Sequence, residues 1–347
     1  MRDVSPASSA PSPASQLREQ VTQGLSLPLV LAPMFLVTSV DLVLSAMASG
    51  AVAAMPTLNA RSPEIWDEWA ATIAAKHAEL GGAVPWAANL VVHGSNPRLA
   101  ADLAVCVKHK VPWVITALGN PRAVVETVHG YGGLVFADVN TPVLARKAAS
   151  YGVDGLVLIC SGAGGHTGPM TPAAFVAAVR EFFDGPIIVG GGLVDGNGIR
   201  AVQAMGADLA YMGTRFIATQ ESAAVDAYKR MVVDSDFADI ICTNAFTGAW
   251  ANKLRPSLVA AGLDPDKLVA KDRFDLNRPE EEVKAWKDLW SAGHGVGSVR
   301  AIETVAAVVG TLRQEYTQCL ARLDQDPWMA RWRSSEGHRH TAQALRP

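Results

Sequence analysis

The chain has 347 residues, of which 49% are hydrophobic and 18% charged, so it can bury the core of one large α/β domain. Its net charge of −3 argues against electrostatic binding of nucleic acid. The four cysteines lie far apart without a zinc-ligand spacing, so we expect no metal site. We find no apolar run long enough for a membrane span and no signal peptide, which predicts a cytoplasmic protein without a membrane partner.

Short apolar runs recur along the first two thirds of the chain, and most are continuously apolar, as is typical of strands covered on both faces. The predicted strands are Leu29–Met34, Ala51–Met55, Pro85–Val91, Trp113–Ala117, Gly133–Ala137, Leu156–Cys160, Pro186–Val189 and Leu209–Met212. The predicted helices between them are Pro63–Leu80, Pro97–Lys108, Pro121–His129, Thr141–Tyr151, Thr171–Phe183 and Gly198–Met205.

This alternation of strands and helices predicts an α/β fold, a (β/α)₈ TIM barrel over residues 24–220. A doubly wound open sheet is the alternative, but it usually has fewer strands and a recognisable nucleotide-binding turn. Residues 1–23 include a Ser/Pro/Ala-rich segment and are expected to be disordered, and residues 334–347 are expected to be a loose tail.

Residues 221–333 depart from the repeating pattern and predict a C-terminal helical cap packed on the barrel mouth. Helices are expected at Glu221–Val233, Glu280–Trp290 and Val299–Leu323, with Thr243–Leu254 as a loop.

A single histidine, His166, lies in a glycine-rich turn directly after the sixth predicted strand. Glycines let the backbone approach a ligand closely, and a histidine can exchange protons near neutral pH. Functional residues of TIM barrels follow the carboxyl ends of the strands, so we interpret His166 as catalytic. The alternative is a histidine that only tethers its loop by hydrogen bonds. The turn does not match the dinucleotide pattern G-x-G-x-x-G, because Thr167 stands where the third glycine would be.

Glycines also follow the last two predicted strands of the barrel. Gly191 and Gly192 come after the seventh strand, and Gly213 and Thr214 after the eighth. Phosphate groups commonly bind at this place in TIM barrels through backbone N–H groups and a helix N-terminus. The pattern predicts a phosphate site, and the alternative is that these glycines only form tight turns.

Three further residues at strand ends have open roles. Met34 could lie against a flat cofactor or fill the core, because its side chain is flexible and polarisable. Asn89 is an amide within an apolar run, and it could bind a pyrimidine-like ring edge or hold a loop. Asp138 could contact a ligand or cap the next helix.

Four blocks together resemble the nitronate monooxygenase family, formerly called 2-nitropropane dioxygenases, over about Leu27 to Leu323. The blocks are Ala32-Pro33-Met34, Ala163-Gly164-Gly165-His166-Thr167-Gly168, Gly191-Gly192-Leu193-Val194-Asp195-Gly196 and Gly213-Thr214-Arg215-Phe216-Ile217-Ala218-Thr219 with Glu221-Ser222. The later run Trp290-Ser291-Ala292-Gly293-His294-Gly295-Val296-Gly297 is similar to the family's C-terminal segment.

The resemblance implies an FMN-dependent barrel enzyme in which His166 is the active-site histidine. It implies that Ala32, Pro33 and Met34 line the flavin, that Asn89 contacts its ring, and that Gly191, Gly192, Gly213 and Thr214 hold its phosphate. Gly164, Gly165 and Asp138 complete the expected cofactor contacts.

The chain departs from the family's pattern at several positions. Gly162 stands where many members carry Glu, and Thr167 where many carry Arg. Asp138 replaces a lysine or threonine of some members, and Ala249-Trp250 replaces a more basic segment. These departures concern the charge and substrate preference of the site more than FMN binding.

The resemblance implies oxidation of alkyl nitronates by molecular oxygen, with His166 as acid or base. Members of the same family also include FMN-dependent NAD(P)H oxidoreductases of enoyl or acyl thioesters and of quinones, which share these motifs. We therefore expect a small-molecule substrate with either oxygen or NAD(P)H as the second reactant, and a homodimer as one assembly to test. A non-enzymatic protein that binds a phosphate ligand is a further alternative, but it leaves His166 unexplained.

Overall fold

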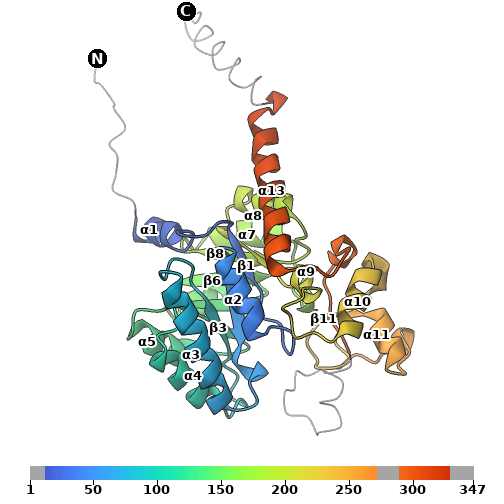
Figure 1. Ribbon diagram of the computed structural model, residues 1–347, viewed down its shortest axis with the longest axis horizontal. Coiled ribbons are helices and arrows are strands. Elements are labelled where there is room, and N and C mark those ends of the chain that lie inside the picture. The colour runs from blue at the N-terminus through green and yellow to red at the C-terminus, as the bar shows by residue number, and fades with distance from the viewer. Residues whose placement is uncertain (1–11, 272–288, 329–347) are drawn as a thin grey trace, which may run out of the picture.

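The structure is a computed structural model that describes residues 12–271 and 289–328. Eight parallel strands form a closed barrel (Figure 1), which confirms the predicted TIM barrel. In barrel order they are β1 (Leu29–Leu31), β2 (Val52–Pro56), β3 (Ala87–Val91), β4 (Trp113–Ala117), β5 (Leu134–Val139), β6 (Gly155–Ile159), β8 (Ile187–Gly190) and β9 (Leu209–Met212). The barrel closes where β1 pairs with both β2 and β9.

A ring of helices surrounds this barrel, and several of these helices begin with a polar side chain that caps the first turn. The helices are α2 (Val40–Ala48), α3 (Pro63–Glu79), α4 (Leu99–Lys108), α5 (Arg122–His129), α6 (Pro142–Ala149), α7 (Pro172–Arg180), α8 (Gly196–Ala204) and α13 (Val305–Asp324), with the 3₁₀-helix η1 (Thr57–Asn59) before α3. Thr141 and Asp195 accept backbone N–H groups in the first turns of α6 and α8.

The inside of the barrel holds its own apolar cluster, separate from the core between strands and helices. Trp113, Phe136 and Leu209 belong to this interior cluster, and the rings of Trp113 and Phe136 lie 4.8 Å apart. Because side chains alternate along a strand, the residues two positions further on also face inward, nearer the carboxyl ends. That layer contains Asp138 after Phe136 and Tyr211 after Leu209.

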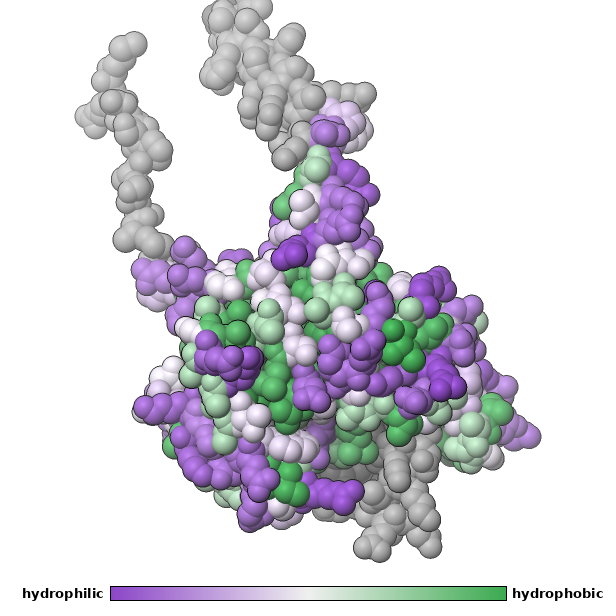
Figure 2. All heavy atoms as spheres, viewed as in Figure 1, coloured by the Kyte–Doolittle hydropathy of each residue, from purple (hydrophilic) through white to green (hydrophobic). Residues whose placement is uncertain are grey.

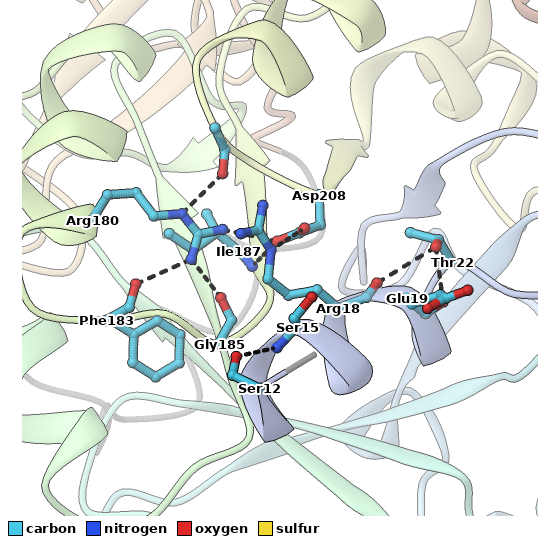
Figure 3. A network of polar contacts seen from close by, with 11 residues as sticks. Ser12, Ser15, Arg18, Glu19, Thr22, Arg180, Phe183, Gly185, Ile187 and Asp208 are labelled. Carbon is cyan, nitrogen blue, oxygen red and sulfur yellow. Dashed lines mark hydrogen bonds and ion pairs between the residues drawn. The ribbon is translucent and has the colours of Figure 1, made fainter. Parts of the chain in front are cut away.

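The expected disorder of residues 1–23 is wrong for the part that the structure describes, because α1 (Pro13–Gln20) is a helix. Leu17 and Val21 pack against the interior cluster, so α1 covers the amino-terminal end of the barrel. Figure 3 shows the polar network that holds it there: Arg18 Nε lies 2.7 Å from Asp208 Oδ1, and Arg180 lies 2.9 Å from Asp208 Oδ2. The same carboxylate accepts a hydrogen bond from the Ile187 backbone N–H at the start of β8.

The segment after β9 differs from the expected cap of helices and loops. It contains the short helices α9 (Thr214–Ile217), α10 (Asp226–Asp234) and α11 (Arg255–Ala260), and the 3₁₀-helices η2 (Phe237–Asp239), η3 (Pro265–Lys267) and η4 (Val296–Ser298). It also contains β10 (Ile240–Thr243) and β11 (Ala251–Leu254), which form an antiparallel sheet with β7 (Gly165–His166). The prediction of a loop over Thr243–Leu254 is therefore wrong at Thr243 and at Ala251–Leu254, whereas residues 244–250 do connect the two strands as a loop. The predicted helix at Glu280–Trp290 and the predicted tail at 334–347 lie outside the described residues, apart from Leu289 and Trp290.

The last described helix, α13, does not cap the mouth as we expected. It packs beside α8 and α2 on the flank of the barrel and takes the place of the eighth barrel helix (Figure 1). Tyr316 donates a hydrogen bond to Gln203 of α8 at 2.6 Å, and Glu315 accepts one from the Gly196 backbone at 2.9 Å. The part of α13 that extends beyond the barrel is covered mainly by hydrophilic residues (Figure 2). Within residues 12–271 and 289–328, we find no helix that combines the length and apolar character of a membrane span.

Candidate active site

A cavity of about 1160 Å³ opens at the carboxyl ends of the barrel strands. Every site residue predicted from the sequence lines it: Ala32, Pro33, Met34, Asn89, Asp138, Gly164, Gly165, His166, Gly191, Gly192, Gly213 and Thr214. The barrel topology brings these residues together because nearly all of them stand at or after the carboxyl ends of strands, Asn89 being the middle residue of β3. Their shared location is thus a feature of the fold, and their individual contacts with a cofactor stay predictions.

The glycines after β8 and β9 are placed for close approach of a ligand. Gly191 has φ +141°, and a Cβ added there would lie 2.7 Å from the Ser161 carbonyl oxygen. Gly192 has φ +66°, and an added Cβ would meet no atom within 4 Å, so the space above it is open. The Gly192 N–H itself donates to the Gly162 carbonyl at 3.2 Å, so this amide supports the loop. In the short helix α9, which begins at Thr214, the Phe216 N–H donates to the Gly213 carbonyl at 2.8 Å.

The segment around Gly293 covers the glycine region, by which we mean the glycines that follow β8 and β9. The sequence pattern alone did not show this role. The Gly293 N–H donates to Thr214 Oγ1 at 2.8 Å, and the His294 N–H donates to the Gly162 carbonyl at 2.9 Å. A Cβ added to Gly164 would lie 2.8 Å from the Gly293 nitrogen. These contacts join the loop before His166 to the start of α9.

His166 lies on the short strand β7, not in an irregular turn as predicted. It pairs with Ala251 of β11, and the next residue, Thr167, donates its N–H to the Trp250 carbonyl at 3.0 Å. Burial is the main reason that the pKa of His166 is lowered to about 4, and the nearby charge of Lys253 lowers it further. The imidazole is therefore neutral at pH 7, and it is not the group titrating near neutrality that the sequence suggested.

Lys253 is a cavity residue that the sequence analysis missed, because it falls in the segment we interpreted as a loop. Its side chain is 2% exposed, and Nζ donates a hydrogen bond to the Leu289 carbonyl at 3.1 Å. Burial lowers the pKa of Lys253 to about 8, so it remains mostly charged at neutral pH. It contributes positive potential on the side of the cavity that holds His166.

The inner wall of the cavity carries the three polar side chains Asn89, Asp138 and Tyr211. Asn89 donates a hydrogen bond to the Ile115 carbonyl at 3.2 Å. Asp138 stands within β5 and faces the barrel interior, so it does not cap the following helix, where Thr141 has that role. Tyr211 was missed because we read its strand as a uniformly apolar run.

The rim of the cavity includes exposed apolar side chains. Phe35 is 48% exposed, Leu36 43% and Leu144 46%, although each lines the opening. Leu36 and Leu118 both adopt left-handed backbone conformations, with φ +59° and +60°. Non-glycine residues keep such a strained backbone only where the surrounding structure imposes it. Strained residues of this kind are common at ligand sites.

Other chemistries find little support among the described residues. No group of His, Cys, Asp or Glu side chains in this part of the chain could hold a metal ion. Burial raises the pKa of the Cys160 thiol to about 12, so it is not a thiolate nucleophile at neutral pH.

Comparisons with known proteins point to one enzyme family. The nitronate monooxygenase family model matches residues 59–271. A (3aS,4S,5R,7aS)-5-hydroxy-7a-methyl-1-oxo-octahydro-1H-indene-4-carboxyl-CoA dehydrogenase of Rhodococcus jostii is 29% identical over 50% of this chain and 49% of its own. A nitronate monooxygenase of Paraburkholderia phytofirmans is 28% identical over 75% of each chain. The match thus spans about half the length of the first relative.

A solved structure shares the fold. The nitroalkane oxidase of Streptomyces ansochromogenes superimposes with a TM-score of 0.74 at 24% identity, covering 87% of this chain and 99% of that one. At this level of identity, the similarity supports the barrel architecture.

Proposed function

Since the chain belongs to the nitronate monooxygenase family, we propose that it is an oxidoreductase that binds FMN at the barrel mouth and oxidises alkyl nitronates with molecular oxygen. The observation that carries this proposal is the placement of His166 beside the glycine region, inside one cavity. The volume of about 1160 Å³ exceeds that of typical small-molecule pockets, so it can hold a cofactor together with a substrate.

The residues present fit a flavin mononucleotide. The open space above Gly192 leaves room for a phosphate group beside the backbone N–H groups of the loop that leads into α9. In the same cavity, Asp138 Oδ1 and Tyr211 OH are buried and lack a hydrogen-bond partner within the described residues, which suits a ligand with polar ring atoms. Ala32, Pro33 and Met34 would lie along the ring, and Asn89 would contact its edge.

When bound, FMN supplies the electron transfer between the nitronate and oxygen, which no side chain of the protein can perform. The protein contributes position and electrostatics. His166 orients the anionic substrate by a hydrogen bond from its neutral ring and carries a proton at an imidazole nitrogen. Lys253 adds positive potential, which favours an anion in this part of the cavity.

The low pKa of His166 makes a specific prediction about pH. A histidine with an ordinary pKa near 6.5 would become charged as the pH falls from about 7 to about 5.5. Since the pKa of His166 is about 4, it stays neutral over that interval. We expect kcat/KM for freshly prepared propyl-2-nitronate, measured as oxygen uptake, to lose less than about twofold in this range. A tenfold fall with a midpoint near 6.5 would contradict a neutral, buried His166.

The exposed apolar side chains at the rim favour a second candidate function, the reduction of a larger thioester or quinone by NAD(P)H through the bound flavin. Exposed Phe35, Leu36 and Leu144 offer more apolar surface than a small nitronate can cover. The similarity to a carboxyl-CoA dehydrogenase supports the same alternative. In that case His166 would donate a proton to the reduced substrate.

A further inference from the structure

Asp138 and Tyr211 belong to the inward-facing layer of barrel side chains that lines the cavity. Asp138 follows Phe136 by two residues on β5, and Tyr211 follows Leu209 by two on β9, so both project to the interior. Tyr211 is 7% exposed and lines the cavity together with Asp138. They are near enough that a charge on Asp138 would raise the pKa of Tyr211.

Their polar atoms have no protein partner among residues 12–271 and 289–328. Asp138 Oδ1 and the Tyr211 hydroxyl are both closed off from solvent and form no hydrogen bond there. Leaving two such atoms unsatisfied is costly, and native structures rarely do so without a ligand or water. The two atoms therefore indicate a ligand with complementary hydrogen-bonding atoms.

The surroundings identify the kind of atom that this ligand must present. Burial raises the pKa of Asp138 to about 7, so the neutral acid, a hydrogen-bond donor, is well populated. Tyr211 also remains a donor, because burial raises its pKa well above the usual range. Among the described residues, the other titratable groups facing this cavity are His166 and Lys253 from the small sheet, Tyr228 from α10, Lys147 from α6, and Tyr151 just after α6. The lysines disfavour a cationic ligand, and two neutral donors require an acceptor atom on the ligand.

We propose that Asp138, as the uncharged acid, and Tyr211 form a pair of donors that binds the carbonyl or ring-nitrogen edge of a flat heteroaromatic ring. Under the proposed function, on which this inference rests, that ring belongs to FMN. The pair would hold the ring by neutral hydrogen bonds from the barrel interior.

The test uses the flavin-loaded enzyme and follows the visible flavin absorption from about pH 5.5 to about pH 9. We expect one titration step with a midpoint at or above 7, because donation to the ring favours the acid form of Asp138. Asp138→Asn should abolish the step while keeping the side-chain shape. Tyr211→Phe should weaken FMN binding about tenfold, as measured by fluorescence quenching. Tyr131→Phe is the matched control, because its hydroxyl bonds to the Val111 carbonyl at 3.0 Å outside the cavity.

Two results would overturn the inference alone, and one would overturn the proposed function as well. A titration step that persists in Asp138→Asn would belong to another group, such as Lys253. FMN affinity in Tyr211→Phe equal to that of Tyr131→Phe would remove Tyr211 from the site. A wild-type protein that neither carries nor takes up FMN would overturn both the cofactor assignment and the pair's role.

Discussion

Replacing His166 with alanine should lower kcat for nitronate oxidation by roughly 10²- to 10⁴-fold, the usual contribution of a positioned acid or base, while FMN stays bound. The reason is that His166 belongs to β7 and lines the cavity, whereas the predicted phosphate contacts belong to other strands. The ratio of flavin to protein absorbance measures cofactor content, and oxygen uptake per bound flavin measures turnover.

The variant His166→Gln separates orientation from proton transfer. Glutamine can donate a hydrogen bond but does not titrate, so it should recover part of the affinity for nitronate without recovering full kcat. The opposite pattern, in which His166→Ala loses FMN but retains its specific activity per flavin, would remove His166 from the chemistry and make it a structural residue.

Replacing Gly191 with alanine should weaken FMN binding by roughly 10- to 100-fold. The added Cβ would lie 2.7 Å from the Ser161 carbonyl oxygen and 2.9 Å from the Cys160 Cβ, at a φ of +141° that L-residues rarely adopt. Relief of this clash must separate the loops after β6 and β8, which together shape the glycine region. Titration of the purified variant with FMN, followed by fluorescence quenching, measures the effect.

Gly262→Ala is the control for backbone strain alone. Gly262 has φ +79°, an added Cβ meets no atom within 4 Å, and the residue is not among those that line the cavity. We expect it to lose about 1 kcal/mol of folding stability with unchanged FMN affinity. Equal FMN affinity in Gly191→Ala and wild type would exclude Gly191 from the cofactor site.

The structure explains one departure from the family pattern. Gly162, which replaces a common glutamate, has φ +85°, and an added Cβ would lie 3.0 Å from His294 Nδ1 and 3.3 Å from the Gly192 nitrogen. The segment around Gly293 therefore packs where a longer side chain would have to project. In this chain, a glutamate at position 162 would displace the contacts between that segment and the loop before β7.

The barrel and the gathering of the site could be predicted because they depend on local patterns. Continuous apolar runs indicate buried parallel strands, and the ends of such strands must meet at one face of a barrel. His166, Gly191 and Asp138 could therefore be assigned to one site without knowledge of any contact between them.

What could not be predicted depends on pairings between distant segments. Ala251–Leu254 forms a strand only because it pairs with β7 and β10, and this pairing brings Lys253 to the cavity. The short helix α1 is ordered by Arg18 and Asp208, which lie 190 residues apart. The low pKa of His166 likewise arises from burial by residues that are distant in the sequence. Such burial could not be predicted from the sequence around His166.

The most direct test of the proposed chemistry is anaerobic stopped-flow absorbance of the flavin-loaded protein, mixed separately with propyl-2-nitronate and with NADH or NADPH. The proposed function predicts that the nitronate alone bleaches the flavin absorption within the time of one turnover and that oxygen restores it. Bleaching by a nicotinamide, with none by the nitronate, would contradict nitronate oxidation and assign the protein to the second candidate function.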